Sequence, residues 1–218
     1  MENVGERKLQ TEQQQRHREW IQREGVHFEY PVQDSTYERP HEKARLAWHV
    51  LNTKDVPNYQ DYMGYRSIVE FGCSTGRILK ECGGIVGVDL SPDIIAANKK
   101  NDPERSWFCA DVTQLKLNGF WGQGFHTVLL PGFLEHLTFD QALDVVRKAK
   151  RIATNRILIT VPNGTDTLKN VQDYSNFKHQ FIMSEIRLKE FLAVCNGDGW
   201  KVLCTQDENT IFVRMDKT

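Results

Sequence analysis

The sequence lacks several features that mark particular classes of protein. Its five cysteines are spread over 218 residues without a C-x-x-C pair, which argues against a disulfide-stapled scaffold and against a zinc site of the usual spacing. No stretch approaches the roughly 20 consecutive apolar residues of a membrane-spanning helix, and the N-terminus has no signal-peptide pattern. No internal repeat is present. We therefore expect reduced thiols and a soluble protein located in the cytoplasm.

The chain also lacks an excess of charge of either sign. Lysine and arginine number 28 against 29 aspartates and glutamates, a formal net charge of −1. This balance disfavours nucleic acid or an anionic membrane as a partner attracted by overall charge. The hydrophobic fraction of 39% suffices for an ordinary globular core. We expect a small-molecule partner, no membrane and no nucleic acid, and the sequence leaves the oligomeric state open.

The composition divides the chain into three parts. Residues 1–52 are polar and predicted to be helical, and they form either a loosely docked terminal region, which we favour, or a lid over a substrate. Residues 53–66 form a connection marked by Pro57 and Gly64. Residues 67–218 form the core domain.

Within the core, short apolar runs alternate with amphipathic ones, as in βα units on a parallel sheet. The predicted strands are residues 67–72, 84–90, 106–112, 126–132 and 156–162, followed by a hairpin in 200–215. Ser91 and Thr138 each fit a helix N-cap, and a last helix is expected after Ser184. The predicted fold is a doubly wound, Rossmann-like α/β domain with a mostly parallel seven-stranded sheet and a C-terminal antiparallel hairpin.

The most informative segment is EFGCSTG at residues 70–76, where a strand runs through small residues into a helix. Such a turn lets backbone N–H groups approach a ligand closely. Asp89 ends the second predicted strand and Asp111 ends the third. Because the carboxyl ends of parallel strands share one edge of the sheet, these loops are expected to converge on one adenosine-shaped ligand.

These residues resemble the class I S-adenosylmethionine-dependent methyltransferases, in the small-molecule branch with an LEH motif after the fourth strand. The matching segments are EFGCSTG, VGVDLS, CADV, HTVLLPGFLEHL, ITVPNG and the pair His179 and Ser184. The resemblance covers residues 67–215. It implies S-adenosyl-L-methionine as the cofactor and a methyltransferase as the activity.

The resemblance also implies a set of cofactor-binding residues. Gly72, Ser74 and Gly76 would line the methionine side, Asp89 would bind the ribose hydroxyls, and Asp111 would accept a hydrogen bond from the adenine amino group. The full set is Glu70, Gly72, Ser74, Gly76, Asp89, Leu90, Asp111, Val112, Leu130 and Pro131. Arg39, Arg45 or Tyr37 could reach the cofactor carboxylate.

The departures from the family pattern carry expectations of their own. Ser74 replaces a glycine, which the turn tolerates if its φ is negative or its hydroxyl is useful there. His126 replaces an aspartate at the head of the fourth strand, and we expect a structural role for it. Gly132 stands where some relatives have the first glutamate of a metal motif. Because Glu135 and His136 alone are too few ligands, no metal is expected.

We expect methyl transfer to a small-molecule acceptor at oxygen, with His136 and His179 as candidate catalytic bases. The alternatives are an RNA or protein methyltransferase and a module that binds S-adenosylmethionine without turnover. The basic cluster Arg147, Lys148, Lys150, Arg151 and Arg156 would suit RNA. We interpret it instead as basic residues that complement the dipole at the end of a helix.

Overall fold

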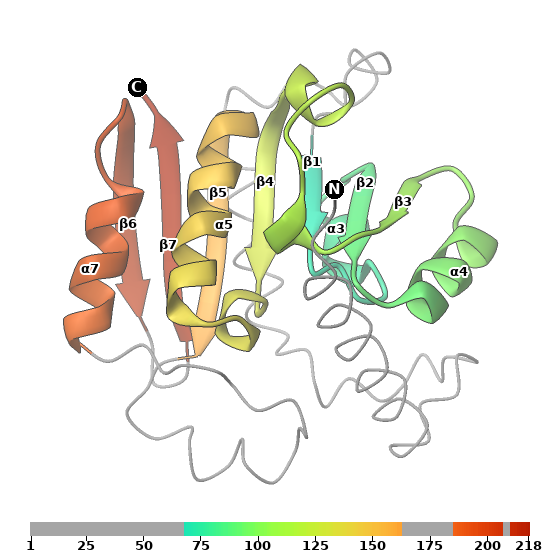
Figure 1. Ribbon diagram of the computed structural model, residues 1–218, viewed down its shortest axis with the longest axis horizontal. Coiled ribbons are helices and arrows are strands. Elements are labelled where there is room, and N and C mark those ends of the chain that lie inside the picture. The colour runs from blue at the N-terminus through green and yellow to red at the C-terminus, as the bar shows by residue number, and fades with distance from the viewer. Residues whose placement is uncertain (1–67, 163–184, 207–209) are drawn as a thin grey trace, which may run out of the picture.

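Seven strands form one sheet in the order β3-β2-β1-β4-β5-β7-β6 in the computed structural model, which describes residues 68–162, 185–206 and 210–218 (Figure 1). The strands are β1 (Ile68–Phe71), β2 (Val86–Asp89), β3 (Ser106–Cys109), β4 (Phe125–Pro131), β5 (Ala153–Pro162), β6 (Trp200–Gln206) and β7 (Thr210–Lys217). The first five run parallel, and β7 lies antiparallel between β5 and β6. This confirms the predicted Rossmann-like sheet and its C-terminal hairpin.

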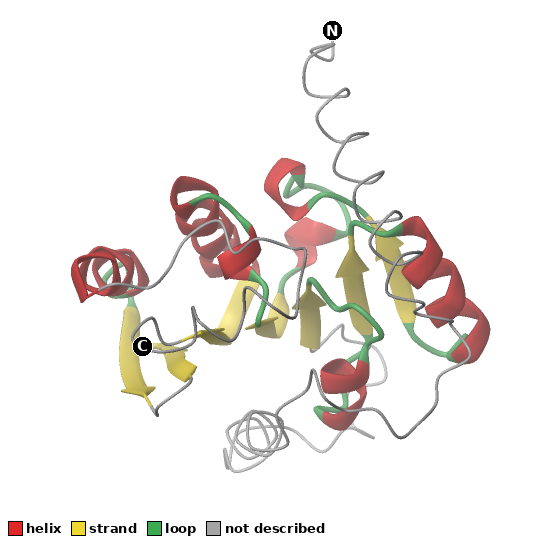
Figure 2. Cartoon of the chain, turned by 90° about the horizontal axis from the view of Figure 1, so that it is seen from below, coloured by secondary structure: helices red, strands yellow, loops and turns green. Residues whose placement is uncertain are grey.

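Helices cover both faces of this sheet. The α-helices are α3 (Arg77–Glu81), α4 (Pro92–Asn101), α5 (Phe139–Ile152) and α7 (Glu185–Cys195), and the short 3-10 helices are η2 (Val112–Gln114), η3 (Trp121–Gln123) and η4 (Leu134–His136). Figure 2 shows α5 and α7 above the strands and α3 below them. The layering follows from the crossover connections, because each parallel strand must be reached by a segment that passes over a face.

The predicted helix starts are confirmed where the structure describes them. The Ser91 hydroxyl accepts a hydrogen bond from the Ile94 N–H (3.3 Å), with Pro92 in the first turn of α4. Thr138 and Gln141 form a reciprocal capping box at the start of α5, with bonds of 3.0 and 3.3 Å. These caps satisfy donors that the first helical turn leaves without intrahelical partners. Ser184 lies outside the described residues.

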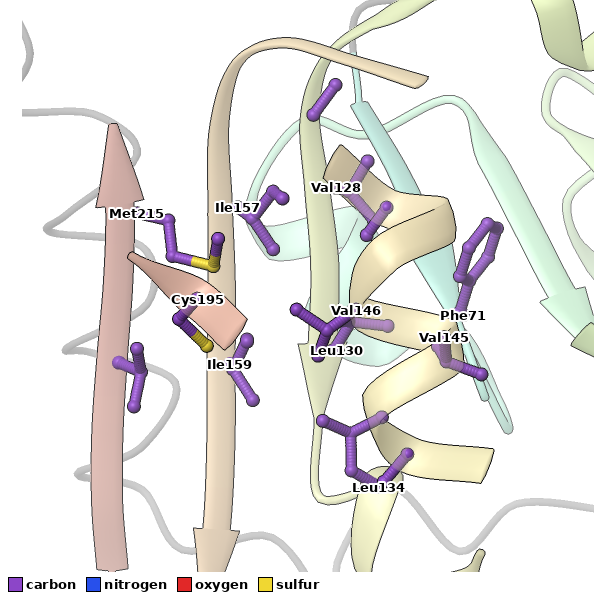
Figure 3. Close-up of a cluster of buried hydrophobic side chains, with 14 of the residues drawn as sticks. Phe71, Val128, Leu130, Leu134, Val145, Val146, Ile157, Ile159, Cys195 and Met215 are labelled. Atoms are coloured by element: carbon purple, nitrogen blue, oxygen red, sulfur yellow. The ribbon is translucent and has the colours of Figure 1, made fainter. Parts of the chain in front are cut away.

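The core follows the two-residue period of the strands. On β5, Ile157 and Ile159 face the cluster beneath α5 and α7, whereas Leu158 faces the smaller cluster on the opposite side. Figure 3 shows the larger cluster, with Leu130 of β4 packed toward α5. Both faces are buried, so the central strands are apolar almost throughout, as parallel sheets require.

Two strand boundaries differ from the prediction by three residues, and the other described boundaries differ by at most two. The predicted third strand, residues 106–112, ends at Cys109, because its neighbour β2 ends at Asp89, which pairs with Cys109. The fifth begins at Ala153, three residues before the predicted start, and Ala153 pairs with Phe125. The apolar pattern missed this start because Thr154, Asn155 and Arg156 are polar.

The predicted N-terminal region, residues 1–52, and the connection 53–66 lie outside the described residues. In the part of the chain that the structure describes, no helix combines the length and apolar character needed to cross a membrane.

Candidate functional site

The turn that joins β1 to α3 is the centre of the candidate site. Gly72, Ser74 and Gly76 all have left-handed backbone, with φ of 69°, 44° and 68°. A Cβ added at Gly72 would lie 2.4 Å from Cδ2 of Phe133, and one at Gly76 would lie 2.2 Å from the Trp107 ring. Glycine is therefore required at both positions by conformation and by the close approach of an aromatic ring.

Ser74 corrects one expectation. Its φ is positive, so the turn does not tolerate serine by taking a negative φ. A non-glycine residue in this region costs roughly 1–2 kcal/mol. Two hydrogen bonds offset that cost: the Ser74 N–H donates to Oδ2 of Asp89 (2.9 Å), and its carbonyl accepts from Nδ2 of Asn98 (2.7 Å).

Asp89 joins two loops at the carboxyl edge of the sheet. Its Oδ2 accepts from the Ser74 N–H of the β1 loop, and its Oδ1 accepts from the Ser91 N–H (2.9 Å) after β2. The side chain is 9% exposed, so the carboxylate reaches the surface only at this edge. Each carboxylate oxygen can accept a second hydrogen bond, which leaves Asp89 able to bind a diol while it holds both loops.

Glu70, predicted among the cofactor-binding residues, is 2% exposed and has a role inside the protein. Its Oε2 accepts from the Leu79 N–H (2.8 Å), a donor in the first turn of α3. The N-cap of α3 is Gly76, which has no side chain to do this. Burial raises the pKa of Glu70 well above its ordinary value, opposed by the Leu79 bond, and the Asp89 charge raises it further.

Asp111 lies two residues beyond β3 and is the N-cap of η2. Its Oδ1 accepts from the Thr113 N–H (2.8 Å) and hydroxyl (2.7 Å). Among the described residues, none donates a hydrogen bond to its Oδ2. The residue is half-buried at the same edge as Asp89, so one carboxylate oxygen is fixed by the protein and the other is available to a ligand.

The apolar residues predicted to contact the cofactor differ in how accessible they are to a ligand. Leu90 is half-buried just after β2, where its side chain can meet a ligand, whereas Val112 is 4% exposed and packs into the core. Leu130 is fully buried and points into the cluster of Figure 3, so only its backbone lies near the site. Pro131 is buried at the end of β4.

Hydrogen bonds to Thr160 of β5 fix the backbone just after the end of β4. The Gly132 N–H donates to the carbonyl (3.0 Å) and to the hydroxyl (3.1 Å) of Thr160. His136 is half-buried in the following helix, η4, on the same edge of the sheet as the loops after β1 and β2. His179, Arg39, Arg45 and Tyr37 lie outside the described residues.

His126 has the structural role expected for it. Its Nδ1 is 3.0 Å from the Thr127 hydroxyl, and its Nε2 is 3.1 Å from Nδ2 of Asn155. It starts β4 at the opposite end of the strand from the site.

Three residues hold the loops in place although the sequence did not predict that role for them: Asn98, Thr160 and Lys148. A signal for Asn98 existed, because it follows the buried Ile94 and Ile95 at helical spacing and is itself only 5% exposed. A polar residue on the inner face of a helix predicts a buried partner. Thr160 and Lys148 carried no comparable signal.

The basic cluster, four residues of which lie on α5 and one, Arg156, on β5, makes other contacts than the expected interaction with the helix dipole. Lys148 bonds to carbonyls of η2, and Lys150 bonds to the carbonyls of Val194 and Gly197 near the end of α7. Arg156 is 4% exposed and its Nε donates to Asp216 (2.6 Å). These three therefore bind other elements of the protein, while Arg147 and Arg151 remain exposed.

Comparison with known proteins fits this geometry. A family model described as a methyltransferase domain matches residues 68–155. A search among curated proteins found no match. Residues 68–155 therefore carry the sequence pattern of a methyltransferase domain, on the fold described above.

Solved structures share the fold at low sequence identity. The magnesium protoporphyrin IX methyltransferase of Synechocystis PCC 6803, with bound S-adenosylhomocysteine, is 15% identical, with 82% of each chain covered and a TM-score of 0.55. The plantazolicin methyltransferase BpumL, in complex with a monoazolic desmethylPZN analog and S-adenosylhomocysteine, is 11% identical, with 81% of this chain and 83% of that chain covered and a TM-score of 0.61. A small RNA methyltransferase is 14% identical over 87% of this chain and 27% of its own, with a TM-score of 0.59. Proteins of this fold thus act on different classes of acceptor.

Proposed function

We propose that this protein is an S-adenosylmethionine-dependent methyltransferase that methylates a small-molecule acceptor at oxygen. The observation that carries the proposal is the convergence of three loops at the carboxyl ends of adjacent strands β1, β2 and β3. Asp89 ties the first two loops together, and Asp111 presents one carboxylate oxygen from the third. Open α/β sheets bind nucleosides at this edge.

The residues present fit the cofactor. Asp89 retains acceptor capacity for the ribose hydroxyls, Asp111 retains Oδ2 for the adenine amino group, and Leu90 supplies an apolar side chain for the ring. The turn formed by residues 72–76 would bring backbone close to the methionine part. Glu70 contributes indirectly, since it fixes the start of α3 behind that turn.

When bound, S-adenosylmethionine supplies a methyl group that is activated by an adjacent sulfonium. The protein then has to hold the acceptor oxygen in line with that methyl group and exclude water, which together account for much of the rate increase. An acceptor hydroxyl must also lose a proton. Our first candidate to take it is His136, half-buried in η4 after β4, and His179 is the second candidate on sequence grounds.

The distribution of basic side chains supports a small acceptor over RNA. Of the five cluster residues, Lys148, Lys150 and Arg156 bind within the protein, and Arg147 is paired with Asp144 (2.6 Å). Four of the five side chains thus donate to other groups of the protein, which leaves fewer donors for a phosphate backbone on this surface. An RNA or protein methyltransferase, or a module that binds the cofactor without turnover, remains as an outcome of the tests.

Calorimetric titration with S-adenosylhomocysteine tests the cofactor. We expect a one-to-one binding isotherm for the wild-type protein and a loss of about tenfold or more in affinity for Asp89→Ala, because a hydrogen-bonded charge is removed. The exposed Asp144→Ala is the matched control and should bind as the wild type does. Absence of binding to the intact wild-type protein would rule the proposal out.

The acceptor and the base are tested next. Small hydroxylated compounds, RNA and protein fractions are each incubated with methyl-labelled cofactor, and label in the small-molecule fraction is the expected result. With that acceptor, His136→Ala and His179→Ala are then compared. Loss of a general base lowers kcat by roughly 10²–10⁴-fold, so activity within a few-fold of wild type excludes that histidine.

A further inference from the structure

Lys148 connects α5 to the loop that carries Asp111. Its Nζ donates to the carbonyl of Val112 (3.1 Å) and to the carbonyl of Thr113, both in η2. These residues lie 36 and 35 positions away in the chain, so the contact is purely tertiary. The ammonium therefore holds the two residues that directly follow Asp111.

The loop is a single turn of 3-10 helix, a conformation with poor hydrogen-bond geometry: the Leu115 N–H donates to the Val112 carbonyl at 3.3 Å. The Val112 side chain anchors the turn in the core. Asp111 caps the N–H side of this turn through Thr113, and Lys148 binds the carbonyl side. Fixing both ends of η2 determines the direction in which Oδ2 of Asp111 points.

The Lys148 ammonium is partly removed from solvent, as expected for a side chain that is held by hydrogen bonds to η2. Its ammonium is partly desolvated, which lowers its pKa, while the nearby Asp111 and Asp144 charges oppose that change. A lysine that only complemented the helix dipole would keep its ammonium in water. Here two of its three donors go to one short segment of another element.

We propose that Lys148 is a positioning residue that gives the site its preference for adenine, by holding Asp111 so that Oδ2 accepts a hydrogen bond from the exocyclic amine of the base. This rests on the proposed function, because it assumes that the adenosine part of the cofactor binds at Asp111. Lys148 itself does not touch the ligand; it acts through η2.

The test compares two ligands that differ only at that amine. S-adenosylhomocysteine carries the amino group, and its 6-deamino analogue, in which purine replaces adenine, carries a hydrogen in its place and offers the carboxylate no N–H donor there. We expect the wild-type protein to bind the first about tenfold or more tightly than the second. In Lys148→Met, which keeps the length of the side chain and removes the charge, the preference should fall to about threefold or less.

Lys150→Met is the matched control. Lys150 is on the same helix and also donates to backbone carbonyls, but at the end of α7. A general loss of stability would affect both variants, whereas only Lys148→Met should lose discrimination. Lys148→Arg, which can still donate to both carbonyls, should restore most of the preference.

The outcomes separate the two proposals. If the wild-type protein binds neither compound, the proposed cofactor is wrong. If it binds S-adenosylhomocysteine with the expected preference and Lys148→Met keeps that preference, or if the wild type shows no preference, the role of Lys148 is overturned. Should Lys148→Met fail to fold, as judged by circular dichroism, Lys148→Gln in the same comparison decides the matter.

Discussion

Three polar side chains from three different elements hold the backbone of residues 72–76 and its approach to α3. Asp89 binds the Ser74 N–H, Asn98 binds the Ser74 carbonyl, and Glu70 binds the N–H of Leu79 just beyond the turn. Ser74 keeps its left-handed backbone conformation because both its N–H and its carbonyl are fixed by hydrogen bonds to side chains. The shape of the turn is therefore a property of side chains that lie outside it.

Glu70→Gln removes the titratable charge of Glu70 but keeps a side-chain oxygen that can accept the Leu79 N–H. Burial raises the pKa of Glu70 in the folded protein above its ordinary value of 4.5. The folded state then binds the proton more tightly, so this group favours folding most at acidic pH. That contribution is lost as pH rises from about 4.5 through the folded pKa. Because a glutamine side chain does not titrate, the stability of Glu70→Gln should gain on wild type from pH 5 to pH 8.

Urea unfolding at several pH values measures this. Glu70→Ala is the companion variant: it leaves the Leu79 N–H without its partner, and because neither alanine nor glutamine titrates, it should be about 1–3 kcal/mol less stable than Glu70→Gln at all of these pH values. A constant difference between wild type and Glu70→Gln across the range would contradict the assignment.

Gly72→Ala tests the close approach of Phe133. The added methyl group combines a left-handed φ with a contact of 2.4 Å to the ring. The expected loss is about 1–2 kcal/mol from conformation plus about 1–3 kcal/mol from overpacking. In a Phe133→Ala background only the conformational part should remain. Gly119→Ala is the control, because Gly119 has a φ of 52° and nothing within 4 Å of an added Cβ. Equal costs in both backgrounds, by thermal unfolding, would refute the steric account.

At this scale the sequence predicted the residues of the motif but not the contacts that hold them. Gly72, Gly76 and Asp89 stand at fixed offsets from predictable strand ends. Asn98 and Lys148 bind partners 24 and 36 positions away in the chain. A local sequence pattern does not indicate which distant residues will be in contact. Helical periodicity could have placed Asn98 on an inner face, but not against Ser74.

Among the elements, helix α5 contacts the sheet, η2 and the end of α7. Its apolar stripe packs against the sheet, Lys148 reaches η2, and Lys150 reaches the end of α7. The start of this helix was predictable because a capping box is local. The destinations of its two lysines were not, because a lysine in a last helical turn also fits a dipole interaction.

Lys150→Met should loosen α7 without affecting the cofactor site. Nζ of Lys150 donates to the carbonyls of Val194 (3.1 Å) and Gly197 (3.4 Å) and to Asp198 (3.0 Å). Removing the charge takes this donor from the Val194 carbonyl in the last turn of α7, at a cost of about 1–3 kcal/mol. Faster amide exchange in α7 with unchanged affinity for S-adenosylhomocysteine is the expected result. The exposed Arg147→Met should leave both measurements at their wild-type values.

For the whole molecule, the sheet order places the candidate site. The strand order reverses between β1 and β4, and the loops after β1, β2 and β3 lie on one side of that point. The C-terminal hairpin was predicted, but not the insertion of β7 between β5 and β6. A signal was present in the sequence: TIFVRM at residues 210–215 is apolar except for one arginine and its first threonine, as in a central strand, whereas residues 200–206 mix apolar and polar side chains. In the structure β7 is mostly buried, and of the β6 residues only Trp200 is buried.

Binding of a small cofactor to this nearly neutral protein should depend little on salt. At 100 times the dissociation constant, S-adenosylhomocysteine should add about 2.7 kcal/mol of stability and raise Tm by roughly 5–10 °C. Since S-adenosylhomocysteine is a zwitterion without net charge near pH 7, its binding releases few counterions, and the shift should be nearly equal in 50 mM and 500 mM NaCl. Binding of an RNA acceptor would instead weaken steeply over that range, since each phosphate contact adds about −0.7 to the logarithmic slope. Thermal unfolding with the cofactor product alone, and again with RNA added at both salt concentrations, distinguishes the two. An additional, salt-sensitive shift with RNA would show that the acceptor is a polyanion and would overturn the small-molecule assignment while leaving the cofactor site intact.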